Sequence, residues 1–283
     1  MAKVRVITDS GSDLPKSKVD ELSIVVVSLS VRFGSDEFVD TVTLSPREFW
    51  EKCKNSPQSS LPETAAPSPG SFQEAFLKSK EDGYDGIVCV TLSSGVSSTF
   101  QSALQAKELV KDEISVEVVD SQFVSIGQGL IAVGAAEAAR DGKDVSEVAQ
   151  LANELIGRTV LMGTLDTLEY LKRGGRIGSG AALVGSLLSI KPIVEVRDGK
   201  VAGESKHRTR GKSLDYVAEK AAIPDEVERF ALLNGEAQDF EVFKNKVLAI
   251  KDRQNIIYAD IGPIIGTHVG QGAVGFAYQT VKK

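Results

Sequence analysis

Short apolar runs alternate with amphipathic stretches over the first half of the chain. The apolar runs are rich in β-branched residues and predict strands at 3–8, 24–34, 86–91 and 114–120. Helical spacing lies between them, for example at 45–55, where Ser45, Pro46 and Glu48 form a capping-box signature. Strands separated by helices predict parallel pairing with right-handed crossovers.

The pattern changes after about residue 157. Strand-like runs now follow one another with fewer helices between them, at 159–164, 191–206, 228–234, 255–262 and 273–280. The sequence "RDGK" at 197–200 is typical of a hairpin turn, so antiparallel pairing is expected here. We therefore predict two domains, residues 1–157 and residues 158–283. Four prolines between residues 56 and 71 predict a loop.

Composition narrows the class of protein. The chain has 283 residues, 42% of them hydrophobic and 25% charged, which is typical of a globular protein with an ample core. Lys and Arg total 33 against 39 Asp and Glu, and a net charge of −6 argues against a general nucleic-acid binder. The two cysteines, Cys53 and Cys89, have neither metal nor redox spacing. We expect a cytoplasmic protein without a signal peptide or a transmembrane segment.

Hydroxyl side chains gather where the strand at 86–91 is followed by a helix. One serine is enough to cap a helix, but "TLSSGVSSTF" supplies several more. Parallel sheets place ligands at this edge, and a helix N-terminus attracts anions. The sequence predicts an anion site at Ser94, Ser97, Ser98 and Thr99, with capping and loop solvation as the alternative.

Two other polar loops, "TDSGSD" (8–13) and "ETAAPSPGSF" (63–72), can converge on the same edge. They do so if the strands at 3–8 and 86–91 are close in the sheet. We expect Asp9 and Asp13 to cap and form turns rather than to bind a metal.

Two segments resemble nucleotide-binding motifs but lack the sequence context that these motifs require. "GQGAVG" (270–275) matches a dinucleotide fingerprint, but the chain ends too soon after it for a crossover helix and a second strand. "RGKS" (210–213) lacks the upstream glycine of a phosphate loop, since Lys206 stands there. We interpret the first as chance or a tight turn, and a kinase-like transferase is correspondingly disfavoured.

A serine hydrolase is the principal enzyme alternative. His268 lies between glycines, in what we interpret as a tight connection between strands, and can act as a base or remain a solvated loop residue. The sequence "GVSST" lacks the second glycine of a nucleophile elbow, which argues against a hydrolase without excluding it.

Gly, Ala and Ser are frequent in the stretch 125–139 and in the apolar part of the stretch 168–196. Helices of such residues can line an apolar tunnel or pack closely against sheets, and both interpretations stay open. Beside that apolar part lie Lys172, Arg173 and Arg176, which are either solvated surface or cations presented to a phosphate or a partner.

Together these segments resemble the DegV family, the fatty-acid-binding proteins of bacteria. The motifs that carry the resemblance span nearly the whole chain, from "ITDSGSDLP", "TAAPSPGSF", "LSSGVSSTFQSA" and "VVDSQFVSIGQG" to "LEYLKRGGRIG", "KPIVEVRDGKV", "HRTRGKS" and "GTHVGQGAVG". The resemblance implies an α/β fold of two domains, the first an α/β/α layer with a parallel sheet and the second an α/β layer with a mixed sheet. It also implies a long-chain fatty acid held between them, without a metal or other cofactor.

The resemblance further implies which residues act. It assigns the carboxylate of the fatty acid to Thr64, Ser93, Ser94, Ser97 and His268. It implies a carrier that is not itself an enzyme and that presents the carboxylate to a fatty acid kinase, so that acyl phosphate is formed for phospholipid synthesis. Arg173 matches a residue linked to the kinase reaction, and we group Arg176 and Arg208 with it.

The chain departs from the family pattern at two places. Ala65 and Ala66 stand where the family commonly has a serine and a glutamine, and Ser98 stands where it commonly has a glycine. The first change removes a hydroxyl and an amide near the expected carboxylate. Which hydroxyl makes the closest contact is therefore open.

Overall fold

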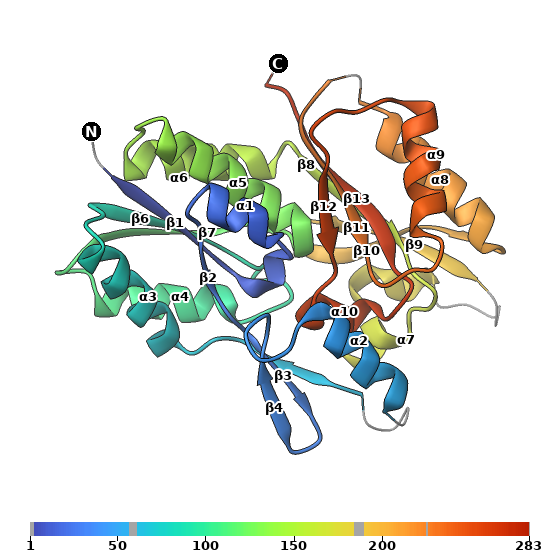
Figure 1. Ribbon diagram of the computed structural model, residues 1–283, viewed down its shortest axis with the longest axis horizontal. Coiled ribbons are helices and arrows are strands. Elements are labelled where there is room, and N and C mark those ends of the chain that lie inside the picture. The colour runs from blue at the N-terminus through green and yellow to red at the C-terminus, as the bar shows by residue number, and fades with distance from the viewer. Residues whose placement is uncertain (1–2, 57–60, 184–189, 225, 283) are drawn as a thin grey trace.

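The computed structural model describes residues 3–56, 61–183, 190–224 and 226–282 (Figure 1). This part of the chain forms three sheets, of four, six and three strands. No helix within it is both long and apolar enough to cross a membrane.

The first sheet belongs to the first half of the chain, and its strands are all parallel. In spatial order they are β2 (Val25–Val27), β1 (Val4–Asp9), β6 (Gly86–Thr91) and β7 (Ser115–Asp120). The helices of this half around it are α1 (Lys16–Glu21), α3 (Pro69–Glu81), α4 (Thr99–Leu109), α5 (Ser125–Arg140) and α6 (Val145–Ile156). Helices α3 and α4 cover one face, and α5 and α6 cover the other (Figure 1). The predicted α/β/α layer is confirmed.

The second sheet belongs to the second half and is mixed, as predicted. Its strands in spatial order are β10 (Lys200–His207), β9 (Lys191–Arg197), β8 (Thr159–Thr164), β13 (Val274–Thr280), β11 (Val227–Asn234) and β12 (Ile257–Asp260). Only the pair β11–β12 is parallel within this sheet. Helices α8 (Arg210–Ala222) and α9 (Phe240–Ile250) lie beside it, on the side away from the first half (Figure 1). The domain boundary at residue 157 stays a prediction.

The third sheet corrects the loop predicted at 56–71. It consists of β4 (Asp36–Val39), β3 (Ser30–Phe33) and β5 (Glu63–Ala65). Strand β5 falls inside the proline-rich stretch because its backbone pairs with β3, Thr64 lying opposite Val31. Helix α3 also begins inside the predicted loop, since Ser68 caps it and Pro69 occupies its first turn. Helix α2 (Pro46–Asn55) has the predicted capping box.

Helix α5 lies between the two main sheets. It contacts β1 and β6 on one side and β8, β11 and β13 on the other, and 13 of its 16 residues are buried. A Cβ at Gly129 would lie 2.9 Å from the carbonyl oxygen of Ser12, and one at Gly134 would lie 2.5 Å from the Leu155 side chain. Close packing against the loop after β1 and against α6 therefore explains these small residues.

The second stretch of small residues is not an α-helix where it is described. Residues Gly178–Leu183 form a 3-10 helix, η2, which packs on β10, and residues 184–189 lie outside the described part of the chain. A Cβ at Gly178, where φ is +51°, would lie 2.2 Å from the Val201 carbonyl oxygen. Close packing is therefore the interpretation that α5 supports, although its first residue, Ser125, also lines an apolar cavity described below. The interpretation of residues 184–189 as a tunnel lining falls outside the described residues.

The loop after β1 ties several elements together through two buried carboxylates. Asp9 caps the 3-10 helix η1 (Ser10–Ser12) and accepts hydrogen bonds from the Leu92 N–H (2.7 Å) and the Gln128 amide (3.0 Å). Asp13 accepts hydrogen bonds from the Ser125 hydroxyl and from the Gly262 N–H (2.9 Å). Burial raises the pKa of Asp9 to about 7 and that of Asp13 to about 8. Both act as caps and turn residues, and no cluster suited to a metal ion occurs among the described residues.

His268 lies in a helix rather than in a connection between strands. Helix α10 (Pro263–Val269) begins after Gly262 with Pro263 in its first turn, and it ends at Gly270, where φ is +76°. The glycines around His268 therefore mark the ends and a close contact of a short helix. A Cβ at Gly266 would meet the rings of Phe49 and Trp50 within 2.9 Å, so α10 packs tightly on α2.

Candidate ligand-binding cavity

Two cavities meet between α10, the loop 92–99 and the mixed sheet. One has a partly polar lining and a volume of about 890 Å³, and the other is apolar with a volume of about 530 Å³, both including space open to solvent. The residues that line both are Val124, Leu171, Val201, Ile265 and Val269. We call them the polar cavity and the apolar cavity; because they share a wall, they adjoin.

Thr64 and His268 face each other in the polar cavity. The Thr64 Oγ1 and the His268 Nε2 lie 3.1 Å apart, although 204 residues separate them in sequence. Strand β5 presents Thr64, and α10 presents His268. The two residues are thus brought together by the third sheet and by the helix that the sequence did not predict.

His268 is held as a neutral imidazole. Burial, and secondarily the positive charge of Arg176, lower the pKa of His268 from 6.5 to about 4. Its Nδ1 is buried and has no hydrogen-bond partner among the described residues. A Cβ at Gly174 would lie 2.3 Å from that Nδ1, so Gly174, the first glycine of "KRGGR", lets the backbone close against the ring.

Ser97 and Ser98 contribute hydroxyls to the same cavity. The Ser97 Oγ lies 2.8 Å from the Thr99 Oγ1 and accepts a hydrogen bond from the Thr99 N–H at 3.3 Å. Ser98 precedes α4, yet its side chain does not cap the helix. The exposed Ser98 hydroxyl has no hydrogen bond within the described chain, which leaves it available to a ligand.

Ser93 and Ser94 make other contacts and do not line either cavity. The fully buried Ser93 donates to the carbonyl oxygen of Gly199 in the β9–β10 turn, at 2.7 Å. Ser94 donates through its hydroxyl and its N–H to the Asp120 carboxylate. The serines of this loop thus have different roles. Ser97 and Ser98 face the cavity, and Ser93 links the two halves of the molecule.

Arg176 is the one permanently charged side chain among the described residues that line the polar cavity. Its Nε donates to the Val96 carbonyl oxygen (3.1 Å) and its Nη1 to the Gly174 carbonyl oxygen (2.6 Å). Its role in a handoff to a partner stays a prediction. In the structure, Arg176 adds a cation to the lining that also contains His268, with no carboxylate among the described lining residues.

The other two arginines lie outside the cavity lining. Arg173 is in the last turn of α7 (Glu169–Arg173), about half exposed, and forms an ion pair with Glu169 at 2.5 Å. Arg208 is exposed in the bend between β10 and α8. Neither belongs to the lining of the two cavities.

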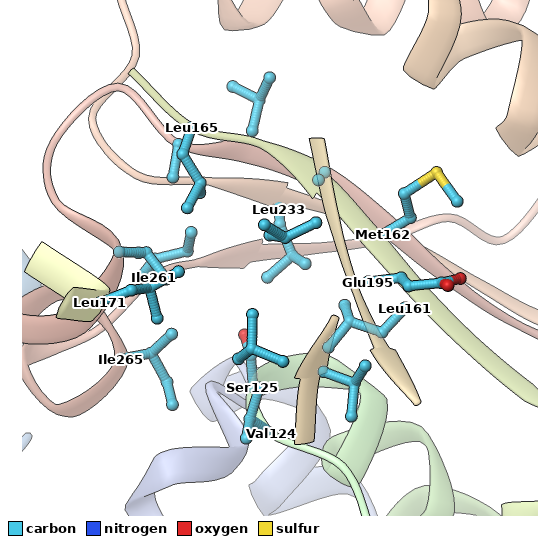
Figure 2. A pocket seen from close by; sticks show the side chains of 18 residues that line it. Val124, Ser125, Leu161, Met162, Leu165, Leu171, Glu195, Leu233, Ile261 and Ile265 are labelled. Carbon is cyan, nitrogen blue, oxygen red and sulfur yellow. The ribbon is translucent and has the colours of Figure 1, made fainter. Parts of the chain in front are cut away.

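The apolar cavity is walled mainly by the mixed sheet, α10 and α7. Figure 2 shows Leu161, Leu233, Ile261 and Ile265 converging on one space, while the carboxylate of Glu195 points away from it. The Ser125 hydroxyl beside this space is already hydrogen-bonded to Asp13. The cavity therefore offers apolar contact along its length and hydrogen-bond donors only where it meets the polar cavity.

The arrangement needed for a serine hydrolase is not assembled. His268 Nε2 pairs with Thr64, the Ser97 hydroxyl pairs with Thr99, and no carboxylate orients His268 among the described residues. Nucleophile, base and orienting acid must form one hydrogen-bonded chain for that chemistry. The geometry instead places hydroxyls, an imidazole and one guanidinium around a shared space.

Some features of the cavity went unrecognised in the sequence. The carbonyl oxygen of Val96 and the backbone of Gly174 position Arg176 and His268, and only the conspicuous double glycine signalled them. Gly275 lines the apolar cavity, although its segment was interpreted as chance or a tight turn. Ala65 and Ala66 line the polar cavity together with Thr64 and His268.

Comparison with known proteins gives matches over the full length of the chain. The model of the DegV family, described as uncharacterised proteins, matches residues 3–281. A DegV domain-containing protein of Halalkalibacterium halodurans is 32% identical, and the match covers 100% of both chains. One of Listeria innocua is 33% identical over 98% of each chain.

Solved structures agree in fold. A fatty-acid-binding DegV family protein from Thermus thermophilus is 28% identical, with a TM-score of 0.90 over 99% of this chain and 100% of that one. DegV of Bacillus subtilis, a fatty acid binding protein, is 29% identical with a TM-score of 0.85 over 99% and 100%. A stearic-acid-binding protein from Eubacterium ventriosum is 25% identical with a TM-score of 0.90 over 99% and 98%. The family model, the relatives and the two-domain fold all agree. We conclude that this chain belongs to the DegV family.

Proposed function

We propose that this protein binds one long-chain fatty acid, with the carboxylate in the polar cavity and the acyl chain in the apolar cavity. The observation that carries the proposal is that the two spaces adjoin: the apolar cavity shares a wall with the cavity lined by Thr64, Ser97, Ser98, His268 and Arg176. The related proteins from Thermus thermophilus and Bacillus subtilis bind fatty acids, which supports the same ligand class here.

The energetics of such a ligand match the two linings. About 14 buried methylenes, at roughly 0.8 kcal/mol each, supply some 11 kcal/mol before the costs of association are subtracted. A carboxylate taken out of water requires hydrogen-bonded partners. Hydroxyls, a neutral imidazole and Arg176 provide them, and the described lining contains no acid to repel it.

The finer proposal is that the protein is a carrier and hands the fatty acid to a partner. We propose a fatty acid kinase that uses ATP in the cytoplasm and forms acyl phosphate for phospholipid synthesis. The exposed Arg173 supports this proposal, because α7 packs on α10 and so places Arg173 close to the helix of His268. Arginine also offers the planar, bidentate geometry that a phosphoryl group favours. Arg208 is exposed and stays a second candidate.

The carboxylate site is tested by removing its hydroxyls. Thr64→Val with Ser97→Ala should weaken oleate or palmitate binding by about 1–3 kcal/mol, because hydrogen bonds to a charged group are lost. The matched control is Ser94→Ala, whose hydroxyl binds Asp120 outside the cavity and whose loss should leave the affinity unchanged. Titration calorimetry measures both. Equal affinities of the double variant and the wild type would place the carboxylate elsewhere.

The neutral state of His268 predicts a pH dependence of stability in the protein without ligand. The folded state disfavours the imidazolium, since its pKa is about 4 against an ordinary 6.5, so protonation favours the unfolded chain below pH 6.5. The free energy of unfolding should therefore fall by roughly 3 kcal/mol more in the wild type than in His268→Gln as the pH drops from 7 to 4. Denaturant titrations at several pH values measure the difference. Parallel curves for the two proteins would show that His268 titrates normally.

The handoff is tested by Arg173→Ala. This variant should retain its fatty acid and its melting temperature but lose acyl phosphate formation with ATP and a cognate kinase. Arg47→Ala serves as the control, because Arg47 is also exposed and paired with a glutamate one helical turn away, on α2. Lipid occupancy and product formation are measured on one preparation. Wild-type yield from fully loaded Arg173→Ala would remove this arginine from the handoff.

A further inference from the structure

Two glycines face each other in the middle of the mixed sheet. Gly163 of β8 lies opposite Gly275 of β13, and both line the apolar cavity. Val194 of β9 is opposite Gly163 on the other side, and Leu233 of β11 is opposite Gly275. Residues directly opposite across strands project from the same face of a sheet. The row Val194–Gly163–Gly275–Leu233 therefore faces the cavity.

The close approach of the two strands requires glycine at both positions. A Cβ at Gly275 would lie 2.5 Å from the Met162 carbonyl oxygen, and one at Gly163 would lie 2.8 Å from the Val274 carbonyl oxygen. Because neither position has a side chain, the sheet carries a trench whose floor is backbone and whose ends are Val194 and Leu233. With strands about 4.8 Å apart, three strand gaps make the row about 14 Å long.

This trench lies away from the anion site. The wall shared with the polar cavity is formed by Val124, Leu171, Val201, Ile265 and Val269, and the glycine pair is not part of it. A chain that starts with its carboxylate at Thr64 and His268 passes this shared wall first. Its distal methylenes then reach the glycine pair.

We propose that the Gly163–Gly275 trench, bounded by Val194 and Leu233, determines the length of acyl chain that the protein accepts. The inference rests on the proposed function and adds a specificity-determining element to it. The ligand class is an unbranched long-chain acid whose distal part crosses the strands over bare backbone. Shorter chains end before the trench and do not depend on it.

The test fills the trench from its edge, because side chains at the glycines would force the strands apart. Val194→Phe places an aromatic ring beside Gly163 and should weaken stearate binding about tenfold or more, as expected when a tight apolar pocket loses space, while decanoate binding changes by less than about threefold. Val194→Ala removes the edge instead and should shift the preference toward the longer acids. Dissociation constants for saturated acids from decanoate to stearate are measured for each folded protein.

The control is Val242→Phe, the same change on the exposed face of α9, where Val242 is 51% exposed. It should retain the wild-type order of affinities. An unchanged length dependence in both Val194 variants, with stearate still bound, would overturn the role of the trench and leave the proposed function intact. Failure of the wild type to bind any acid of the series would overturn the proposed function, and this inference with it.

Discussion

The hydrogen bonds of Asp9 and Asp13 hold the elements of the cavity in their places. Asp9 fixes the start of the hydroxyl-rich loop through the Leu92 N–H and fixes α5 through Gln128. Asp13 fixes the start of α5 through Ser125 and the start of α10 through the Gly262 N–H. Helix α10 carries His268, and the loop carries Ser97 and Ser98. Two buried aspartates of one short loop thus set the geometry of the proposed anion site, to which they do not themselves belong.

The same loop shows why the molecule needs small residues between its sheets. Helix α5 must approach the carbonyl of Ser12 closely enough for Ser125 and Gln128 to reach the two aspartates, and Gly129 permits that approach. Space for a ligand then has to lie elsewhere, against the mixed sheet. There the paired Gly163 and Gly275 leave the backbone bare, and α10 closes the opposite side. Glycine thus serves two purposes: it permits close packing at α5, and it leaves space for a cavity at the mixed sheet.

The sequence predicts the sheets and helices well because their periods are local. The buried run 86–91 and the capping box at Ser45 are examples confirmed by the structure. Prediction from sequence fails where an element depends on a partner that is distant along the chain. Strand β5 exists because β3 pairs with it, and no apolar alternation marks a strand of three residues that carries Thr64. The short helix of His268 has glycines at both ends and resembles a loop in sequence.

Individual roles within a cluster of like residues are equally hard to read from sequence. Ser93, Ser94 and Ser97 are chemically identical, and only the position of the β9–β10 turn directs Ser93 to the Gly199 carbonyl oxygen. The place of Arg176 beside His268 likewise depends on the carbonyl oxygens of Val96 and Gly174, which have no signature in side-chain chemistry. The resemblance to a family shows where such a cluster lies in the sequence. Only the fold shows which partner each serine or arginine of the cluster contacts.

The most direct measurement of the central claim is organic extraction of the purified protein followed by mass spectrometry of the extract. An apolar cavity that adjoins the proposed anion site predicts one long-chain fatty acid per chain, because leaving such a space empty is costly. Delipidated protein should melt at a lower temperature than the lipid-bound protein, and adding oleate or palmitate should restore the higher melting temperature. A ligand that binds only the folded state stabilises it by mass action. Repeated extraction without stoichiometric lipid, together with an unchanged melting temperature on adding either acid, would contradict the account.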